Sequence, residues 1–273
     1  MAACTHEAAT ADTDATPNTS GAFTPVANDL LVVFCTTTDA APATAALTNS
    51  ESTAFTQIAT ALFVSSFHRC YLFVADALSA AVSQTVTFTP TPAGSGSNIL
   101  VCAVSGMTKV GAAAVKQSKV LSNQAGGGTP EVIFDASALT GNPTLAFLAN
   151  TSNPATVTAP TSWSELADIG YATPSGGAEY ATRDSGFTGT TITWGSTSAT
   201  AFGAIIVELD ASGAAASSGA GVNKGLVNRG LVNAGLVHRS MTKLNEWVER
   251  KSGLLVPKDS RLVFPVAVQI HGT

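Results

Sequence analysis

The chain of 273 residues is 45% hydrophobic and only 11% charged, against about 25% charged residues in an average soluble domain. Thr and Ser must supply most of the polar surface, and both suit strands better than helices. This composition excludes a wholly disordered chain and disfavours a helical bundle. We expect no membrane span, because no apolar run approaches the roughly 18 residues required, and no signal peptide, because residues 1–14 lack a basic start and an apolar block.

The formal net charge of −5 conceals two unlike parts. Residues 1–210 hold 5 of the 13 Lys and Arg residues and 15 of the 18 Asp and Glu residues, which gives a net charge of −10. Residues 211–273 hold the remainder and carry a net charge of +5. Such asymmetry predicts different roles for the two parts.

Residues 1–210 contain short strand-like segments separated by turn residues, at roughly the 8 to 12 residue spacing typical of a β-sandwich. In residues 85–89, Val86 and Phe88 alternate with threonines, as in a sheet with one exposed face. Residues 31–34 and 99–102 are apolar throughout, which indicates central strands covered on both faces. The predicted strands are 23–24, 30–37, 54–59, 70–75, 84–89, 98–105, 131–134, 144–148, 162–169, 179–184, 190–194 and 202–208. Residues 107–124 form either a long loop or a pair of strands.

We therefore predict an all-β body over residues 1–210, an antiparallel, jelly-roll-like β-sandwich. Residues 211–220 have the Ala, Ser and Gly composition of a flexible linker. An extended C-terminal arm, residues 221–273, follows it.

The arm opens with a five-residue repeat, GVNK, GLVNR, GLVNA and GLVHR over residues 221–239. Period five matches neither a helix nor a strand, so the repeat has no single face with which to build its own core. We expect an extended strip laid along a partner surface, with contacts from Leu226, Arg229, Leu231, Leu236 and Arg239. The alternative is a turn-rich strip that folds back on its own sandwich.

The rest of the arm is predicted to hold one short helix and a terminal strand. Ser240 is a suitable N-cap for a helix over residues 241–251, in which Trp247 and Arg250 would contact the partner. Residues 261–270 alternate as a strand that contains Phe264 and is interrupted at Pro265, which favours an edge position or addition to a neighbour's sheet.

The four cysteines lack the paired spacing of a redox motif or a zinc site, so we expect reduced thiols packed in the core. A Cys35–Cys70 or Cys70–Cys102 disulfide is the alternative.

We expect no enzyme, cofactor or metal. No nucleophile elbow, phosphate loop or histidine-based triad occurs. A glycosidase would need two paired carboxylates, and the later strands hold five, which we expect to be solvated: Glu165, Asp168, Glu179, Asp184 and Glu208.

The aromatic residues of the body and the basic residues of the arm suggest two kinds of ligand. Trp163, Tyr171, Tyr180 and Trp194 cluster in the later strands and would either stack on sugars or belong to the core. The basic residues of the arm are sparse and accompanied by only Trp247 and Phe264 as aromatics, so an acidic protein surface is favoured over nucleic acid.

Several segments of the body resemble β-sandwich virion proteins encoded among the structural genes of tailed bacteriophages. The resemblance covers residues 8–210 and is carried by DLLVVF (29–34), YLFVAD (71–76), GNP (141–143), GYATP (170–174), RDSG (183–186) and TWGSTS (193–198). It implies a jelly-roll-like domain in a virion made in the host cytoplasm.

Three functions follow from these observations. The first is a non-enzymatic capsid decoration or cement protein, homo-oligomeric and attached through its arm to the major capsid protein or to neck or tail proteins. The second is a head-, neck- or tail-fibre component whose sandwich binds host-surface carbohydrate. The third, a carbohydrate-active enzyme, would require a working pair of carboxylates.

Overall fold

The computed structural model describes residues 2–12, 17–38, 44–64, 68–123, 125–152, 157–172, 174–212, 247–249 and 255–257. The chain divides into two compact units, Met1–Ser217 and Ser218–Thr273. Where the structure describes the chain, its elements are strands and one 3-10 turn, η1 (Gly111–Ala114), so the predicted all-β class is confirmed. A search of those residues finds no helix with the length and apolarity of a membrane span.

The first half of the chain forms a five-stranded antiparallel sheet in the order β1-β8-β3-β6-β5. Its strands are β1 (Cys4–Asp12), β3 (Leu30–Thr38), β5 (Phe55–Val64), β6 (His68–Leu78) and β8 (Gly96–Val104). Every residue of β3 and of β8 is buried. The two segments that are apolar throughout are therefore central strands covered on both faces, as predicted.

A three-stranded sheet, β2-β7-β4, covers one face of this sheet. Its strands are β2 (Asn18–Thr19), β4 (Thr44–Asn49) and β7 (Val86–Thr91). Val86 and Phe88 of β7 point into the core, whereas Thr89 is exposed. The alternating pattern of this segment thus marks an outer layer with one wet face.

The second half of the body forms another five-stranded antiparallel sheet, β12-β13-β11-β15-β9, and a two-stranded sheet, β10-β14. The strands are β9 (Val115–Asn123), β10 (Glu131–Ile133), β11 (Thr144–Asn150), β12 (Ser164–Ala172), β13 (Ser175–Arg183), β14 (Thr191–Thr193) and β15 (Phe202–Leu209). Residues 107–124, for which the sequence allowed either a long loop or a pair of strands, contain η1 and the single strand β9.

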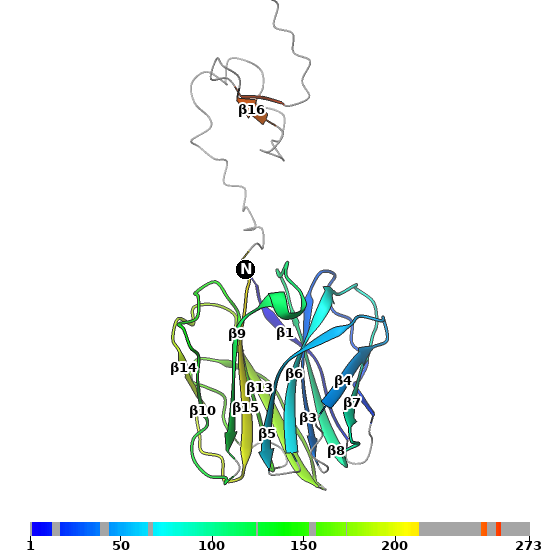
Figure 1. The fold of residues 1–273 in the computed structure, drawn as a ribbon, viewed down its shortest axis with the longest axis vertical. Coiled ribbons are helices and arrows are strands. Elements are labelled where there is room, and N and C mark those ends of the chain that lie inside the picture. The colour runs from blue at the N-terminus through cyan, green and yellow to red at the C-terminus, as the bar shows by residue number, and fades with distance from the viewer. Residues whose placement is uncertain are drawn as a thin grey trace, which may run out of the picture. The chain divides into compact units, whose positions relative to one another are not determined.

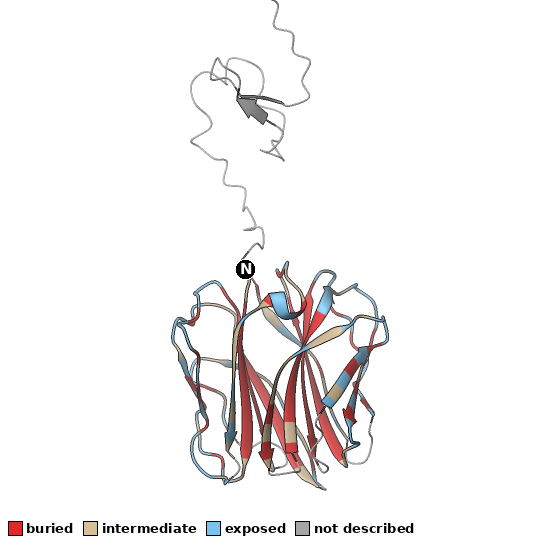
Figure 2. Ribbon diagram, in the orientation of Figure 1, coloured by how far each residue is buried: buried red, intermediate tan, exposed pale blue. Residues whose placement is uncertain are grey.

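The body has four layers, with the two five-stranded sheets packed face to face in the middle (Figure 1). Phe34 on β3 stacks on Phe147 on β11, with ring centroids 4.4 Å apart. A second core, which includes Val132 and Trp194, lies between β10-β14 and the nearer five-stranded sheet. Figure 2 shows the buried residues concentrated in the two central layers.

The two halves of the body repeat one topology. We call β1–β8 the first module (residues 4–104) and β9–β15 the second module (residues 115–209). Numbered within its module, the large sheet of the first module has the order first, last, third, sixth and fifth strand. The second module has seven strands and no counterpart of β4, and its large sheet has the order first, last, third, fifth and fourth strand. In both modules the small sheet pairs the second strand with the one before the last. This is the strand order of a jelly roll. The predicted sandwich is therefore two jelly-roll-like modules in tandem.

The strand register fixes which residues correspond. Phe34 on β3 pairs with Leu72 on β6, and Phe147 on β11 pairs with Tyr180 on β13. Because Phe34 and Phe147 meet between the modules, they occupy the same place in each, and Leu72 therefore corresponds to Tyr180. The correspondence holds at an offset of 108 residues from Arg69 to Val74 of β6 and from Gly177 to Thr182 of β13. Beyond Val74 the pairing of β3 with β6 shifts, whereas the pairing of β11 with β13 stays regular.

A β-bulge repeats at the same place in both modules. On β5 the register shifts between Gln57 and Ala59, and on β12 it shifts between Glu165 and Ala167. In each case the residue after the bulge pairs with the corresponding residue, Leu72 or Tyr180. Bulges are built-in features of a strand, so this coincidence supports an internal duplication.

The cysteines belong to the body. Cys35, Cys70 and Cys102 are buried in the core, Cys4 is half-buried, and all four are free thiols. Burial raises the pKa of the Cys70 thiol to about 12, so that this thiol stays protonated at neutral pH.

The described part of the second unit is an antiparallel pair, β16 (Trp247–Glu249) with β17 (Leu255–Pro257). The prediction of a helix over 241–251 is therefore wrong at Trp247–Glu249. Val248 pairs with Val256, and β-branched and aromatic residues favour such pairs. The predicted terminal strand over 261–270 lies outside the described residues.

Candidate functional site

The chain leaves the second module at the end of β15, and there its backbone is held at every residue. Four consecutive amides donate hydrogen bonds: Leu209 to the Pro143 carbonyl at 2.9 Å, Asp210 to Ala114 at 2.8 Å, Ala211 to Asn142 Oδ1 at 3.1 Å, and Ser212 to Asp210 Oδ1 at 2.9 Å. We call residues 208–212 with their partners the exit clamp.

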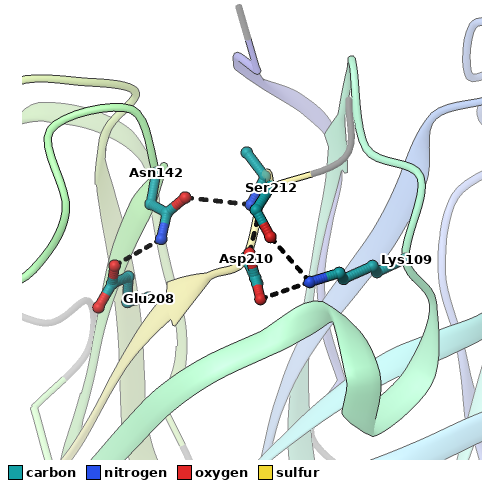
Figure 3. Close-up of polar contacts among 6 residues, drawn as sticks. Lys109, Asn142, Glu208, Asp210 and Ser212 are labelled. Carbon is teal, nitrogen blue, oxygen red and sulfur yellow. Dashed lines mark hydrogen bonds and ion pairs between the residues drawn. The ribbon is translucent and has the colours of Figure 1, made fainter. Parts of the chain in front are cut away.

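Glu208 is buried and accepts hydrogen bonds from several other residues at the exit clamp (Figure 3). Its carboxylate accepts hydrogen bonds from Gln117 Nε2 at 2.6 Å, from Asn142 Nδ2 at 2.6 Å and from the Leu139 amide at 3.0 Å. A buried carboxylate is tolerated when several donors satisfy it. Asn142 thus joins the two levels of the clamp, since its amide group donates to Glu208 and accepts from Ala211.

Lys109 closes the exit clamp on the other side (Figure 3). Its Nζ lies 2.6 Å from Asp210 Oδ2 and 2.9 Å from Ser212 Oγ. The hydrogen bonds from Lys109 and Ser212 lower the pKa of Asp210 to about 2, so this carboxylate is charged at any physiological pH. The loop after β8, which carries Lys109, and the loop before β11, which carries Asn142, both grip the departing chain.

The exit clamp contains amide, carboxylate, ammonium and hydroxyl groups that hydrogen-bond to one another. Its effect is to fix the position of residues 208–212 at the end of β15.

The sequence indicated none of these clamp residues as a group. Glu208 stood among carboxylates expected to be solvated, and the structure corrects this, because Glu208 is fully buried. Asn142 belongs to the GNP motif (141–143), which entered only as part of the resemblance to phage sandwich proteins. Lys109 is one of just five basic residues in the body, which is the signal that pointed closest to the site.

Glu179 is the second carboxylate that we expected in solvent and that the structure buries, at 1% exposure. Burial raises the pKa of Glu179 to about 9, the carboxylates of Asp168 and Glu165 add to the rise, and the indole N–H of Trp194 opposes it. Glu165 and Asp168 are exposed and Asp184 is half-buried.

The four aromatic residues considered for sugar stacking do not share a surface. Tyr171, Tyr180 and Trp194 are buried, and the Tyr180 hydroxyl donates to the Val101 carbonyl at 3.1 Å. Their rings belong to the core and offer no free face to a sugar. Trp163 is half-exposed and meets Phe187 edge-on at 5.5 Å.

The predicted partner-binding residues of the arm are not described, with one exception. Trp247 begins strand β16. The others lie outside the described residues: Leu226, Arg229, Leu231, Leu236, Arg239, Arg250 and Phe264.

Comparison with known proteins finds no matching family model, no matching curated protein and no matching solved structure.

Proposed function

We propose that the chain is a non-enzymatic structural protein of a bacteriophage virion, a capsid decoration or cement protein attached through its C-terminal arm, residues 221–273. The virion context rests on the resemblance of the body to phage sandwich proteins. The observation that supports attachment is the exit clamp, because a chain gripped at four consecutive amides leaves a rigid body from a defined point.

The charge distribution supports the same division of labour. The body is acidic and the residues beyond it are basic, so the C-terminal part would be steered toward acidic surfaces of a capsid or of another copy. The four-layer body has two continuous hydrophobic cores, as expected of a rigid domain that an arm attaches to a particle.

The first test is the number of copies of the chain in a purified particle of the phage that encodes it, measured by quantitative mass spectrometry against the major capsid protein. Hundreds of copies are expected for a decoration protein. A handful would instead place the chain in a neck or fibre.

The second test compares the full chain with a chain that ends after Ser212, which retains every donor and acceptor of the exit clamp. We expect the shortened chain to unfold at the same temperature and to lose binding to particles in a sedimentation assay. The full-length double substitution Arg229→Glu with Arg239→Glu is the matched charge control and should weaken binding. Undiminished binding by the shortened chain would contradict the proposal.

A fibre or neck component that binds host carbohydrate is the second candidate. The feature that favours it is a polar cleft lined by residues of β12 and β13 and by Cys4 of β1.

A further inference from the structure

An open cleft of about 450 Å³ lies where the ends of β12 and β13 meet the start of β1. Clefts of this size hold small-molecule ligands. Its lining is rich in hydroxyl groups and carries one charge of each sign: Ser162, Ser164, Thr182, Arg183, Asp184 and Ser185.

The first module provides an internal control for this cleft. Continued one to three residues beyond the last shared strand pair, the offset of 108 residues sets Ala54, Ala75 and Ala77 against Ser162, Arg183 and Ser185. Three inert methyl groups thus correspond to two hydroxyls and a guanidinium. The first module keeps the β-bulge and the pairing of the two neighbouring strands, β5 and β6, without these polar groups.

In the first module the carboxyl group at the corresponding place is held by neighbours, although it stays exposed. Asp76 corresponds to Asp184, and its carboxylate accepts a hydrogen bond from Thr56 Oγ1 at 2.6 Å. Gly111 of η1 packs so closely on Asp76 that a β-carbon at this position would clash with the carboxyl group. The second module has no such plug among the described residues, and Asp184 lines an open cleft instead.

The polar groups of the cleft are available to a ligand. Asp184 Oδ1 accepts from the Cys4 amide at 2.9 Å and from Thr182 Oγ1 at 3.3 Å, which leaves Oδ2 without a partner among the described residues. Arg183 has no acidic partner there either, and its guanidinium carbon lies 6.0 Å from the centre of the Phe187 ring. An aromatic ring holds an arginine in place without neutralising it.

The backbone at the cleft is also unusual. Ser162 has a φ of 69°, a left-handed conformation that non-glycine residues seldom adopt. Ser162 precedes Trp163, whose ring meets that of Phe187. The half-exposed indole and the arginine thus share one neighbour, the Phe187 ring.

We propose that this cleft binds a carboxylated monosaccharide, with the sugar carboxylate on Arg183 and its hydroxyl groups on Asp184 Oδ2 and the serine hydroxyls. A sugar acid satisfies both charged groups at once, since carboxylate to guanidinium is a strong charge-assisted pair and hydroxyls donate to a free carboxylate oxygen. Inorganic phosphate fits less well, because Asp184 repels its second negative charge. This assignment does not depend on attachment through the C-terminal residues.

The test measures binding of D-glucuronic acid to the full chain by ligand-observed NMR, with D-glucose as the neutral counterpart. We expect glucuronic acid to bind and Arg183→Gln to weaken it about tenfold or more. Ser185→Asp should weaken it through charge repulsion, whereas the isosteric Ser185→Asn should retain it. Lys116→Ala, which removes an exposed cation of β9 outside the cleft, should have no effect.

Four outcomes would overturn the assignment. They are no binding of glucuronic acid at millimolar concentration, equal binding of glucose, equal loss with Ser185→Asp and Ser185→Asn, and displacement of the sugar by inorganic phosphate at the same concentration. The Asp and Asn pair keeps the result interpretable if Arg183→Gln fails to fold, because each variant's fold is checked by its circular dichroism spectrum.

Discussion

Leu72 of the first module corresponds to Tyr180 of the second. The residues that precede them, Tyr71 and Glu179, therefore correspond as well. In the first module Tyr71 packs against Phe73 and Phe88 within an aromatic cluster. The second module places a carboxyl group at this buried position, and burial raises its pKa to about 9. A single residue therefore makes the stability of the second module depend on pH.

We expect stability to fall between about pH 4.5 and pH 9 because of Glu179. The unfolded side chain titrates near its ordinary value of 4.5, whereas the folded one titrates near 9. The folded state binds more protons across this window, so each rise in pH favours unfolding, by at most about 1.4 kcal/mol per pH unit. Glu179→Gln should flatten this dependence and be the more stable protein at pH 8, as measured by urea unfolding at several pH values.

The control for this measurement is Glu131→Gln. Glu131 is exposed on β10 and accepts a hydrogen bond from Thr193 Oγ1, so its removal should leave the pH profile parallel to that of the wild type. A Glu179→Gln profile with the slope of the wild type would show that Glu179 does not titrate in this window.

At the scale of elements, the apolar strands were predicted and the small-residue strands were missed. β3, β6, β8, β11 and β15 contain runs of large apolar residues, and each overlaps a predicted strand. β1 and β4 consist mainly of Ala and Thr, whose weak periodicity marks no core face. These strands form because a neighbour's edge offers hydrogen bonds, which is tertiary information.

In the hairpin of β16 and β17, the sequence predicted a helix where the structure has a strand. Residues 241–251 have the spacing of an amphipathic helix, with Trp247 on the apolar stripe. Cross-strand pairing of Trp247 with Pro257 and of Val248 with Val256 prevails instead. A hydrophobic pattern this short is compatible with both a helix and a strand, and pairing with a second segment decides between them.

The exit clamp leads to a prediction at this scale. Asn142→Leu keeps the side-chain volume but removes the donor to Glu208 and the acceptor of the Ala211 amide. Loss of a donor to a buried carboxylate should cost about 2 kcal/mol or more. We expect a lower free energy of unfolding in urea, and faster hydrogen exchange at the amides of Leu139 and Ala211 than in the wild type.

Thr140→Val is the matched control, because Thr140 is exposed in the same loop and its substitution should stay within about 0.5 kcal/mol. Unchanged exchange at Ala211 in Asn142→Leu would mean that the clamp does not hold the departing chain.

For the whole molecule, the sequence predicted a sandwich but not its duplication. The modules share topology, register and a bulge, yet they differ at most core positions, as in DLLVVF (29–34) against NPTLAF (142–147). Cores tolerate such exchanges when volume and pattern are kept, so a duplicated fold survives after its sequence signal has faded. The exit clamp could not be predicted from the sequence either, because it joins Lys109, Asn142 and Asp210 from three separate segments.

The shared central core predicts that the two modules unfold together. Phe34 and Phe147 contact each other across the interface between the modules, so Phe34→Ala and Phe147→Ala should each cost about 3–5 kcal/mol. Their effects should not add in the double variant, because each single change already removes the contact. Calorimetry should show one transition for the wild type and for both single variants, since neither module keeps its central layer without the other.

Phe88→Ala separates this prediction from a general loss of core volume. Phe88 is fully buried but lies in the outer layer of the first module, packed against Tyr71 and Phe73. Its effect should add to that of Phe147→Ala within about 0.5 kcal/mol, as for two sites that share no contact. Two resolved transitions in the wild type, or full additivity of Phe34→Ala with Phe147→Ala, would show that each module is stable alone and that the interface adds little.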